Sequence, residues 1–156
     1  MAALTKDHKP NDIGERERII KHDGRVEPYR DSYGNPVGPY RVWKLKDDYP
    51  GLAMSRSFGD GVAESLGVVA TPDVKFFDRK PDDRALIICS DGVIEFMSNE
   101  QIGEIIQPFY KNNDCDGATR EVVKAAVKSW GEQEDSIVDD ITCIVVFINT
   151  VKGGTL

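Results

Sequence analysis

The spacing of apolar and polar residues predicts a series of amphipathic helices. Asp12 stands as an N-cap with Glu15 three residues later, a capping-box pattern, and Gly24 lies where this helix should end. Ser98 and Gln101 repeat the capping-box pattern before a second helix. Apolar side chains recur at the helical period in this second helix (Ile102, Ile105, Ile106, Phe109) and in a third (Ala118, Val122, Ala125, Ala126, Trp130).

Other apolar runs predict strands. Ala85–Cys89 is a short apolar run bounded by charge, as expected of a centrally buried strand. Residues 141–148 are rich in β-branched side chains, which favours a second strand. Shorter strands are expected at residues 25–29, 41–43 and 67–70, an edge strand at 74–78 and a turn-rich segment at 30–51, whereas residues 52–60 have no clean period. The pattern favours an α+β fold with helices laid on a largely antiparallel sheet.

Composition limits the classes of function. The 156 residues are 40% hydrophobic and 30% charged, which is ordinary for one globular domain with a real core. The net charge of −7 argues against nucleic acid as a partner, because phosphate backbones call for a basic face. No apolar run approaches the length that spans a bilayer, so no membrane association is expected.

The three cysteines are Cys89, Cys115 and Cys143. An odd count, without a CxxC pair or a histidine cluster, fits neither a disulfide framework nor a zinc site. Cys89 and Cys143 lie inside apolar strand runs, so they are interpreted as small buried hydrophobic residues. A reducing compartment is therefore the expected setting.

Candidate chemistry lies at the ends of the two strongest strands. Asp91 directly follows the run ending at Cys89, and Asp139 and Asp140 stand just before the run that begins at Ile141. Carboxylates held at the tips of buried strands are a rigid way to bind Mg²⁺ or Mn²⁺. Each acid taken alone has a simpler interpretation. It is either a turn residue or a charged residue that flanks an apolar strand and limits aggregation.

Further polar residues admit two interpretations each. Glu95 follows Asp91 by about one turn, so it either faces the same pocket or is a solvated acid. Arg56 either clamps a phosphate or pairs structurally with an acid such as Asp60. Neither histidine has a neighbouring nucleophile, so no residue of the chain is assigned a catalytic role.

Several short motifs, in one order along the chain, resemble the type 2C metal-dependent serine/threonine protein phosphatases. The segment LTKDHKP with the following ERERI resembles the family's LTxDHKP and ExxRI, and LAMSRSFGD is similar to its LAxSRxxGD. SDGVIEFMSNE is similar to SDGxWDxxSNxE, and DDIT to DNxT. Each motif is short, but their shared order and compatible spacing make the resemblance specific.

This resemblance implies roles for the acids. Asp91 and Asp139 take the positions of metal-binding aspartates, and Glu95 takes the position of an acid, usually Asp, associated with a third metal. Asp140 replaces the usual Asn beside the ligand, while Asp60 and Arg56 belong to the central motif in a structural or supporting role. The implied cofactors are Mg²⁺ or Mn²⁺, two or three ions in the complete domain.

The resemblance also implies a fold and an incomplete site. The family fold is a four-layer α-β-β-α sandwich of largely antiparallel sheets, and residues 1–156 correspond to its C-terminal portion, with a flap-like segment around 30–51. The family's Glu-Asp, Asp-Gly-His-Gly and Gly-Asp-Ser-Arg segments are not in this sequence. We therefore expect the isolated chain to bind metal weakly, to be inactive, and either to self-associate or to pair with the missing N-terminal half.

The functional expectation is hydrolysis of phosphoserine and phosphothreonine in phosphoproteins by the parent domain, through a metal-activated water. The alternative is a pseudophosphatase-like module that binds partners without catalysis. A metal-binding sandwich unrelated to phosphatases requires the ordered motifs to be a coincidence. The resemblance implies a cytoplasmic or nuclear location.

Overall fold

The computed structural model describes residues 1–133 and 138–148. The chain forms two compact units. Thr5–Phe76 make up the N-terminal unit, and the C-terminal unit begins at Phe77 and also includes Met1–Leu4. Within the described ranges, none of the helices combines the length and the apolar character needed to cross a membrane.

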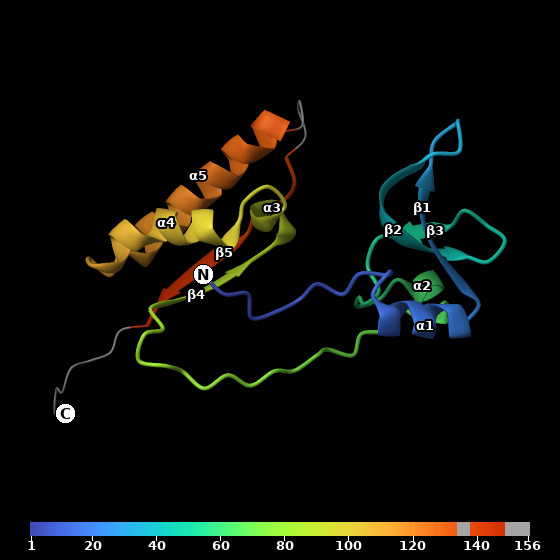
Figure 1. Cartoon of the computed structure of the whole chain (residues 1–156), viewed down its shortest axis with the longest axis horizontal. Helices are drawn as coiled ribbons and strands as arrows, with labels where there is room; N and C mark the ends of the chain where they lie inside the picture. The colour runs from blue at the N-terminus through green and yellow to red at the C-terminus, as the bar shows by residue number, and fades with distance from the viewer. Residues whose placement is uncertain (134–137, 149–156) are drawn as a thin grey trace. The chain divides into compact units, whose positions relative to one another are not determined.

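The N-terminal unit combines helices with a small antiparallel sheet (Figure 1). The three strands pair in the order β1-β2-β3, and both ladders are antiparallel. A cluster of buried apolar residues joins the sheet to the helices: Ile19, Val26, Val42, Ala63, Leu66 and Val68. The elements are α1 (Ile13–Lys21), β1 (Gly24–Arg30), β2 (Pro36–Lys44), β3 (Pro50–Leu52) and α2 (Gly61–Ser65).

Helix α1 is present as predicted, but its ends differ from the prediction. The Asp12 side chain makes no capping hydrogen bond, and it accepts one from Lys6 at 2.8 Å instead. The left-handed residue after the helix is Asp23, with φ of 59°. Gly24 instead begins β1, where a Cβ would lie 2.5 Å from the Ile19 side chain, so close packing requires glycine there.

The shorter strand predictions have mixed outcomes. Strand β1 is confirmed, and β2 extends well beyond the predicted residues 41–43. The predicted strand at 67–70 contributes only an isolated parallel bridge between Arg56 and Val69. The predicted edge strand at 74–78 is wrong: this stretch has no regular structure, and Phe76 is 95% exposed. Alternation alone does not make a strand where no described strand pairs with it.

The C-terminal unit places helices on a two-stranded antiparallel sheet. Strands β4 (Ala85–Cys89) and β5 (Cys143–Phe147) pair in register from Ala85↔Phe147 to Cys89↔Cys143. The predicted capping box of Ser98 and Gln101 is present at the start of α4. The helices are α3 (Asp91–Ile94), α4 (Asn99–Tyr110) and α5 (Cys115–Gln133).

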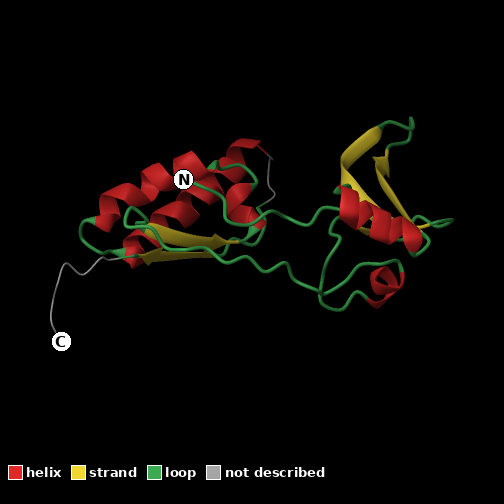
Figure 2. Cartoon of the chain, turned by 60° about the horizontal axis from the view of Figure 1, so that its bottom comes forward, coloured by secondary structure: helices red, strands yellow, loops and turns green. Residues whose placement is uncertain are grey.

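Among the residues that the structure describes, helices cover one face of the β4–β5 sheet and leave the other uncovered (Figure 2). Val145 and Phe147 are buried on that face, against apolar side chains of α4 and α5 such as Ile102 and Val122. The opposite face is also apolar, and we call it the outer apolar face. It consists of the register pairs Leu86 with Val146 and Ile88 with Ile144.

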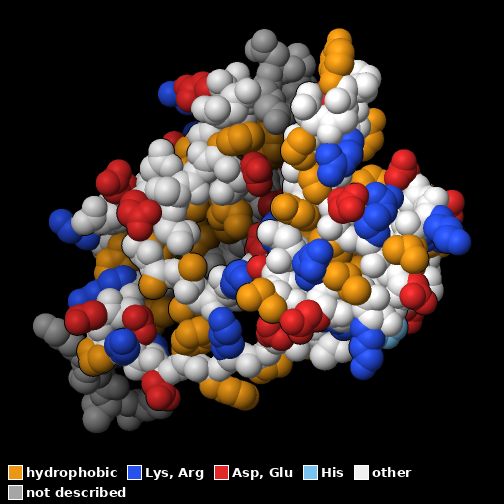
Figure 3. Space-filling view, turned by 45° about the vertical axis from the view of Figure 1, so that its right-hand side comes forward, with side chains coloured by type: hydrophobic (Ala, Val, Ile, Leu, Met, Phe, Trp, Pro, Cys, Tyr) orange, Lys and Arg blue, Asp and Glu red, His pale blue; other side chains and the backbone are white. Residues whose placement is uncertain are grey.

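The outer apolar face lies open in this structure. Ile88 is 55% exposed, Ile144 52% and Val146 43%, so the prediction of a centrally buried β4 is wrong for this chain. On the side of the molecule drawn in Figure 3, hydrophobic side chains lie at the surface among acidic and basic groups. Water-exposed apolar faces of this kind usually mark contact surfaces.

The predicted fold class is confirmed at the level of α+β with antiparallel pairing in each named ladder. The assignment of residues 1–156 to a single catalytic domain with a flap-like 30–51 segment stays a prediction. Residues 30–51 contain the whole of β2 and the turns on either side of it.

Candidate functional site

The two acid-bearing strand ends lie side by side in the C-terminal unit. Cys89, the last residue of β4, pairs with Cys143, the first residue of β5. Asp91 therefore follows β4 at the same end of the sheet at which Asp139 and Asp140 lead into β5. The antiparallel ladder thus brings the two acid-bearing segments to the same end of the sheet. That the Asp91 and Asp139 side chains converge on one cation stays a prediction.

Ser90 fastens the two ends together. Its hydroxyl donates a hydrogen bond to the Asp140 carbonyl oxygen at 3.0 Å and accepts one from the Thr142 amide at 3.0 Å. The Ser90 amide also donates to the Thr142 carbonyl oxygen at 3.0 Å. A small side chain with both a donor and an acceptor thereby extends the ladder beyond its last strand pair and positions Asp91.

Gly92 is required by the closeness of the two segments. A Cβ at this position would lie 2.5 Å from the Asp140 carbonyl oxygen, so no larger residue fits without moving residue 140. The Gly92 carbonyl oxygen accepts a hydrogen bond from the Trp130 indole at 2.8 Å. Phe96 packs edge-on against the same indole, with ring centroids 4.7 Å apart. Through Trp130, helix α5 thus packs against the acid-bearing turn and holds it in place.

The carboxylates themselves are open to solvent. Asp91, Asp139 and Asp140 are all exposed. One oxygen of Asp91 accepts the Gly92 amide at 3.1 Å, and one oxygen of Asp139 accepts the Asp140 amide at 2.7 Å. In each case the second carboxylate oxygen remains open to a ligand, and carboxylate oxygens suit hard divalent cations.

No lysine or arginine within residues 1–133 and 138–148 forms an ion pair with Asp91, Glu95, Asp139 or Asp140. Glu95 is exposed, and its amide donates to the Asp91 carbonyl oxygen at 2.9 Å, which places it one turn beyond that aspartate. Neighbouring carboxylates without a protein cation repel one another unless a proton or a bound cation lies between them.

The donor set is nevertheless incomplete. Among the described residues, no group of three or more His, Cys, Asp or Glu side chains is arranged to hold a metal ion. Asp91 and Asp139 fit a divalent cation in chemical type, but they fill only part of the six or more ligand positions that such a cation needs.

Arg56 and Asp60 lie in the N-terminal unit. The guanidinium of Arg56 binds Glu15, with a shortest distance of 2.6 Å, and also the Asp73 carboxylate and the Thr71 carbonyl oxygen, each at 2.8 Å. Arg56 is therefore a structural arginine, and its acidic partners are Glu15 and Asp73 rather than the expected Asp60. Asp60 precedes α2 in the left-handed conformation, with φ of 56°, and makes no capping bond through its side chain.

Glu15 is the centre of this ionic network. Its side chain is 9% exposed and also binds Arg18, with a shortest distance of 2.6 Å. Burial by itself would raise the pKa of Glu15, but hydrogen bonds from Arg18 and Arg56 outweigh burial and hold the pKa far below its ordinary value. Hydrogen bonds from His8 and Arg56 likewise lower the pKa of Asp73.

The cysteines behind the acid-bearing turn are partly buried thiols. All three cysteines are free, with intermediate exposure, so the expected full burial of Cys89 and Cys143 is not observed. Burial raises the pKa of Cys89, and burial together with the neighbouring Cys89 raises the pKa of Cys143 to about 11. These thiols are therefore protonated at neutral pH.

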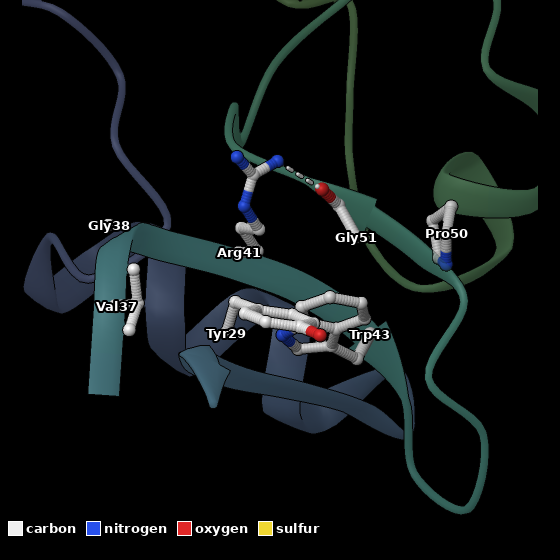
Figure 4. Close-up of a pocket in the computed structure, with 7 residues that line it drawn as sticks. All are labelled: Tyr29, Val37, Gly38, Arg41, Trp43, Pro50 and Gly51. Carbon is white, nitrogen blue, oxygen red and sulfur yellow. Dashed lines mark hydrogen bonds between the residues drawn. The ribbon is translucent and has the colours of Figure 1, made fainter. Parts of the chain in front are cut away.

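The turn-rich segment of the N-terminal unit carries a pocket of about 360 Å³ (Figure 4). Trp43 forms part of its wall, and the close approach of Gly51 to that indole leaves no room for a Cβ. Arg41 reaches across to donate to the Gly51 carbonyl oxygen at 2.8 Å. The lining residues are Tyr29, Val37, Gly38, Arg41, Trp43, Pro50 and Gly51.

Sequence reasoning missed Ser90 and Trp130 as residues that position the site. In the sequence, Ser90 stands out only as part of a motif, and Trp130 only as part of an apolar helix face. A serine directly before the strand-end aspartate is a usable signal, because its hydroxyl can bond a neighbouring strand. The role of Trp130 has no local signal, since its partner Gly92 is 38 residues away in the chain.

Comparison with known sequences gives consistent results. Residues 1–134 match the family model described as protein phosphatase 2C. The chain is 37% identical to probable protein phosphatase 2C 61 of Arabidopsis thaliana, over 96% of this chain and 44% of that protein. It is 36% identical to probable protein phosphatase 2C 48 of Oryza sativa subsp. japonica, over 94% of this chain and 40% of that protein.

Two solved structures have a fold similar to that of this chain. A serine-threonine phosphatase 2C from Toxoplasma gondii aligns with a TM-score of 0.77 at 24% identity, covering 92% of this chain and 46% of that one. A second phosphatase from a pathogenic strain of Toxoplasma gondii aligns with a TM-score of 0.67 at 28% identity, covering 94% and 42%. The chain thus spans less than half the length of these relatives.

Proposed function

This chain belongs to the protein phosphatase 2C family, and we propose that it forms part of a catalytic domain that hydrolyses phosphoserine and phosphothreonine in proteins. The observation that carries the proposal is the hydrogen-bonded junction between the ends of β4 and β5. There, Ser90 ties the backbone next to Asp91 to the backbone of Asp140. This arrangement supports a shared role for Asp91 and Asp139 at one site.

That role is to hold a divalent cation, Mg²⁺ or Mn²⁺. Asp91 and Asp139 each offer an open carboxylate oxygen, and Glu95 and Asp140 add negative charge nearby. A cation bound in such a site lowers the pKa of a coordinated water and so supplies a nucleophile for hydrolysis. The protein's own part is to fix the two carboxylates through Ser90 and Gly92, and to leave their outer oxygens open.

The described residues supply only part of the ligand set, so waters and polypeptide that is not part of this chain would fill the remaining ligand positions. We propose that this chain alone binds Mn²⁺ weakly and lacks measurable phosphatase activity. The incomplete coverage of the relatives, 44% and 40% of their lengths, supports this proposal.

The outer apolar face supports pairing with the complementary part of the domain. Leu86, Ile88, Ile144 and Val146 form two directly opposed apolar pairs on one sheet face, which suits packing against a second sheet. Where that part is lacking, a second copy of this chain would cover the same side chains. A non-catalytic binding module is the alternative function, and it uses the same face without a complete metal centre.

Calorimetric titration with Mn²⁺ tests the metal assignment. We expect weak binding to the wild-type chain, and a loss of at least about tenfold in affinity for both Asp91→Asn and Asp139→Asn. Asp82→Asn is the matched control, because Asp82 is a fully exposed acid of the same unit before β4. If the control lost as much affinity as the two site variants, Mn²⁺ binding would be diffuse and the proposed site would be wrong.

A phosphopeptide assay with Mn²⁺ separates the two functions. The chain alone should show no turnover above buffer, whereas a longer polypeptide that supplies the unmatched part of the domain should be active. Asp91→Asn in that longer polypeptide should abolish activity. An active longer polypeptide that is indifferent to both Asp91→Asn and Asp139→Asn would refute the assigned roles.

A further inference from the structure

Two of the three cysteines face each other directly across the β4–β5 ladder. Cys89 and Cys143 are register partners, and their odd-numbered neighbours in both strands, such as Val145 and Phe147, lie on the helix-covered side. Both cysteines pack at the edge of that same apolar cluster, and neither is fully buried. Cys115 lies on a different element, at the first residue of α5.

The hydrogen-bond pattern decides which kind of pair this is. The Ser90 amide bonds the Thr142 carbonyl oxygen, and the Ile148 amide bonds the Arg84 carbonyl oxygen at the other end of the ladder. Hydrogen-bonded and non-hydrogen-bonded pairs alternate along an antiparallel ladder, so Cys89 and Cys143 occupy a non-hydrogen-bonded pair. Such pairs have their Cα atoms about 4.5 Å apart.

This spacing lies within the range that a disulfide spans, which is about 4.4–6.8 Å between Cα atoms. The Cβ atoms of directly opposed residues are about 4.5–5.5 Å apart, slightly wider than the roughly 3.8 Å mean of a relaxed disulfide. The bridge would therefore form with little backbone movement but under some strain. Strained disulfides are the more easily reduced ones.

We propose that Cys89 and Cys143 are a reversible oxidation site, which closes to a cross-strand disulfide when the protein meets a peroxide. The bridge ties β4 to β5 directly behind the Ser90 junction that positions Asp91. The proposal does not depend on phosphatase activity, because it rests on strand register and on thiol placement alone.

The reaction balances with a peroxide as the oxidant. One cysteine thiol first loses its proton, and the resulting thiolate attacks a peroxide oxygen. The O–O bond breaks, a sulfenic acid forms, and the released hydroxide takes up a proton to become one water. The second thiolate attacks that sulfur, the S–S bond forms, and hydroxide leaves and takes a proton to become a second water. Two thiols lose two electrons in total, and hydrogen peroxide is reduced to two waters.

Mass spectrometry of the full chain tests the proposal. The reduced protein is treated with hydrogen peroxide, its remaining thiols are alkylated, and its peptides are mapped before and after dithiothreitol. We expect a linked peptide pair containing Cys89 and Cys143, which dithiothreitol separates, while Cys115 stays alkylated. The Cys115→Ala variant is the matched control and should form the same link.

Other products would overturn the proposal. A link involving Cys115, or full alkylation of both Cys89 and Cys143 after peroxide, would show that the ladder does not hold them in bonding position. Oxidation of Cys89 and Cys143 to two separate sulfinic acids would likewise show that they are not held in bonding position.

A second measurement needs no variant. Thermal unfolding of the oxidised wild-type chain should occur about 5 °C or more above that of the reduced chain, because the bridge restricts the unfolded state. Dithiothreitol should restore the lower melting temperature. An oxidised chain that carries the bridge but melts at the same temperature as the reduced chain, or below it, would contradict a pair already poised in the native ladder.

Discussion

The Trp130 indole donates a hydrogen bond of 2.8 Å to the Gly92 carbonyl oxygen, joining α5 to the turn that carries Asp91. This buried bond is a main connection between the helical layer and the acid-bearing turn. Replacing Trp130 with Phe keeps an aromatic ring but leaves the Gly92 carbonyl oxygen without its donor. We expect Trp130→Phe to lower the free energy of unfolding of the C-terminal unit by about 1–3 kcal/mol, measured by urea denaturation. A loss within error of zero would mean that water replaces the indole.

A methyl group at position 92 should separate the two acid-bearing ends. Gly92→Ala places a Cβ 2.5 Å from the Asp140 carbonyl oxygen, so residue 140 must move. We expect a loss of about 1–3 kcal/mol in stability and weaker Mn²⁺ binding, measured by urea denaturation and calorimetry. Gly131→Ala is the control, because nothing lies within 4 Å of a Cβ there and alanine favours a helix. Equal effects of the two variants would contradict the proposed crowding.

The Glu15 network should make the N-terminal unit sensitive to acid. The folded pKa of Glu15 lies below its ordinary 4.5, so its ionised form stabilises the fold at all pH values above about 4.5. This contribution is lost as the pH falls from that value through the folded pKa. At neutral pH, Glu15→Gln should cost about 3–5 kcal/mol, because Arg18 and Arg56 lose their shared partner.

The difference in stability between wild type and Glu15→Gln should therefore shrink as the pH falls below about 4.5. Urea denaturation at a series of pH values measures this difference. Glu17→Gln is the control, since Glu17 is an exposed acid on the same helix. A wild-type advantage that stayed constant down to strongly acidic pH would show that charge is not the source of the effect.

Gly51 is constrained in two ways, and a pair of variants separates them. Its φ is +74°, and a Cβ would lie 2.7 Å from the Trp43 ring. Gly38 has a similar φ of +71° with nothing within 4 Å. Both alanine variants should lose about 1 kcal/mol through backbone strain, and Gly51→Ala should lose a further 1–3 kcal/mol, roughly, through the clash with Trp43. Tryptophan fluorescence during urea denaturation measures the stability of both variants. Similar losses for Gly51→Ala and Gly38→Ala would show that the contact with Trp43 adds no cost.

The outer apolar face should drive association. Ile144→Lys places a charge on that face, where the native side chain is 52% exposed, so it should shift the chain toward monomer with little loss of stability. Sedimentation velocity at micromolar concentration compares it with wild type. Val127→Lys is the control, because Val127 is a 46% exposed valine on α5 outside this face. A wild-type chain that is already monomeric would contradict self-association.

Much of the local structure was predictable from residue periodicity. The α4 capping box of Ser98 and Gln101 and the strand at Ala85–Cys89 appear as the pattern indicates, because their signals lie within a few neighbouring residues. The edge strand expected around Phe76 failed because a strand needs a partner, and alternation does not supply one. The Asp12 cap failed because Lys6 competes for the same carboxylate.

The sequence by itself determined the family motifs, the main helices and strands, and the identity of the acids at positions 91 and 139. It could not determine what Arg56 binds, that Trp130 supports Gly92, or that one face of β4 and β5 lies open. Those facts depend on side chains that meet across long stretches of chain, such as Ser90 and Asp140, which are separated by 50 residues. Periodicity reports only which face of an element is apolar, whereas the packing of the whole unit decides what that face and its polar neighbours contact.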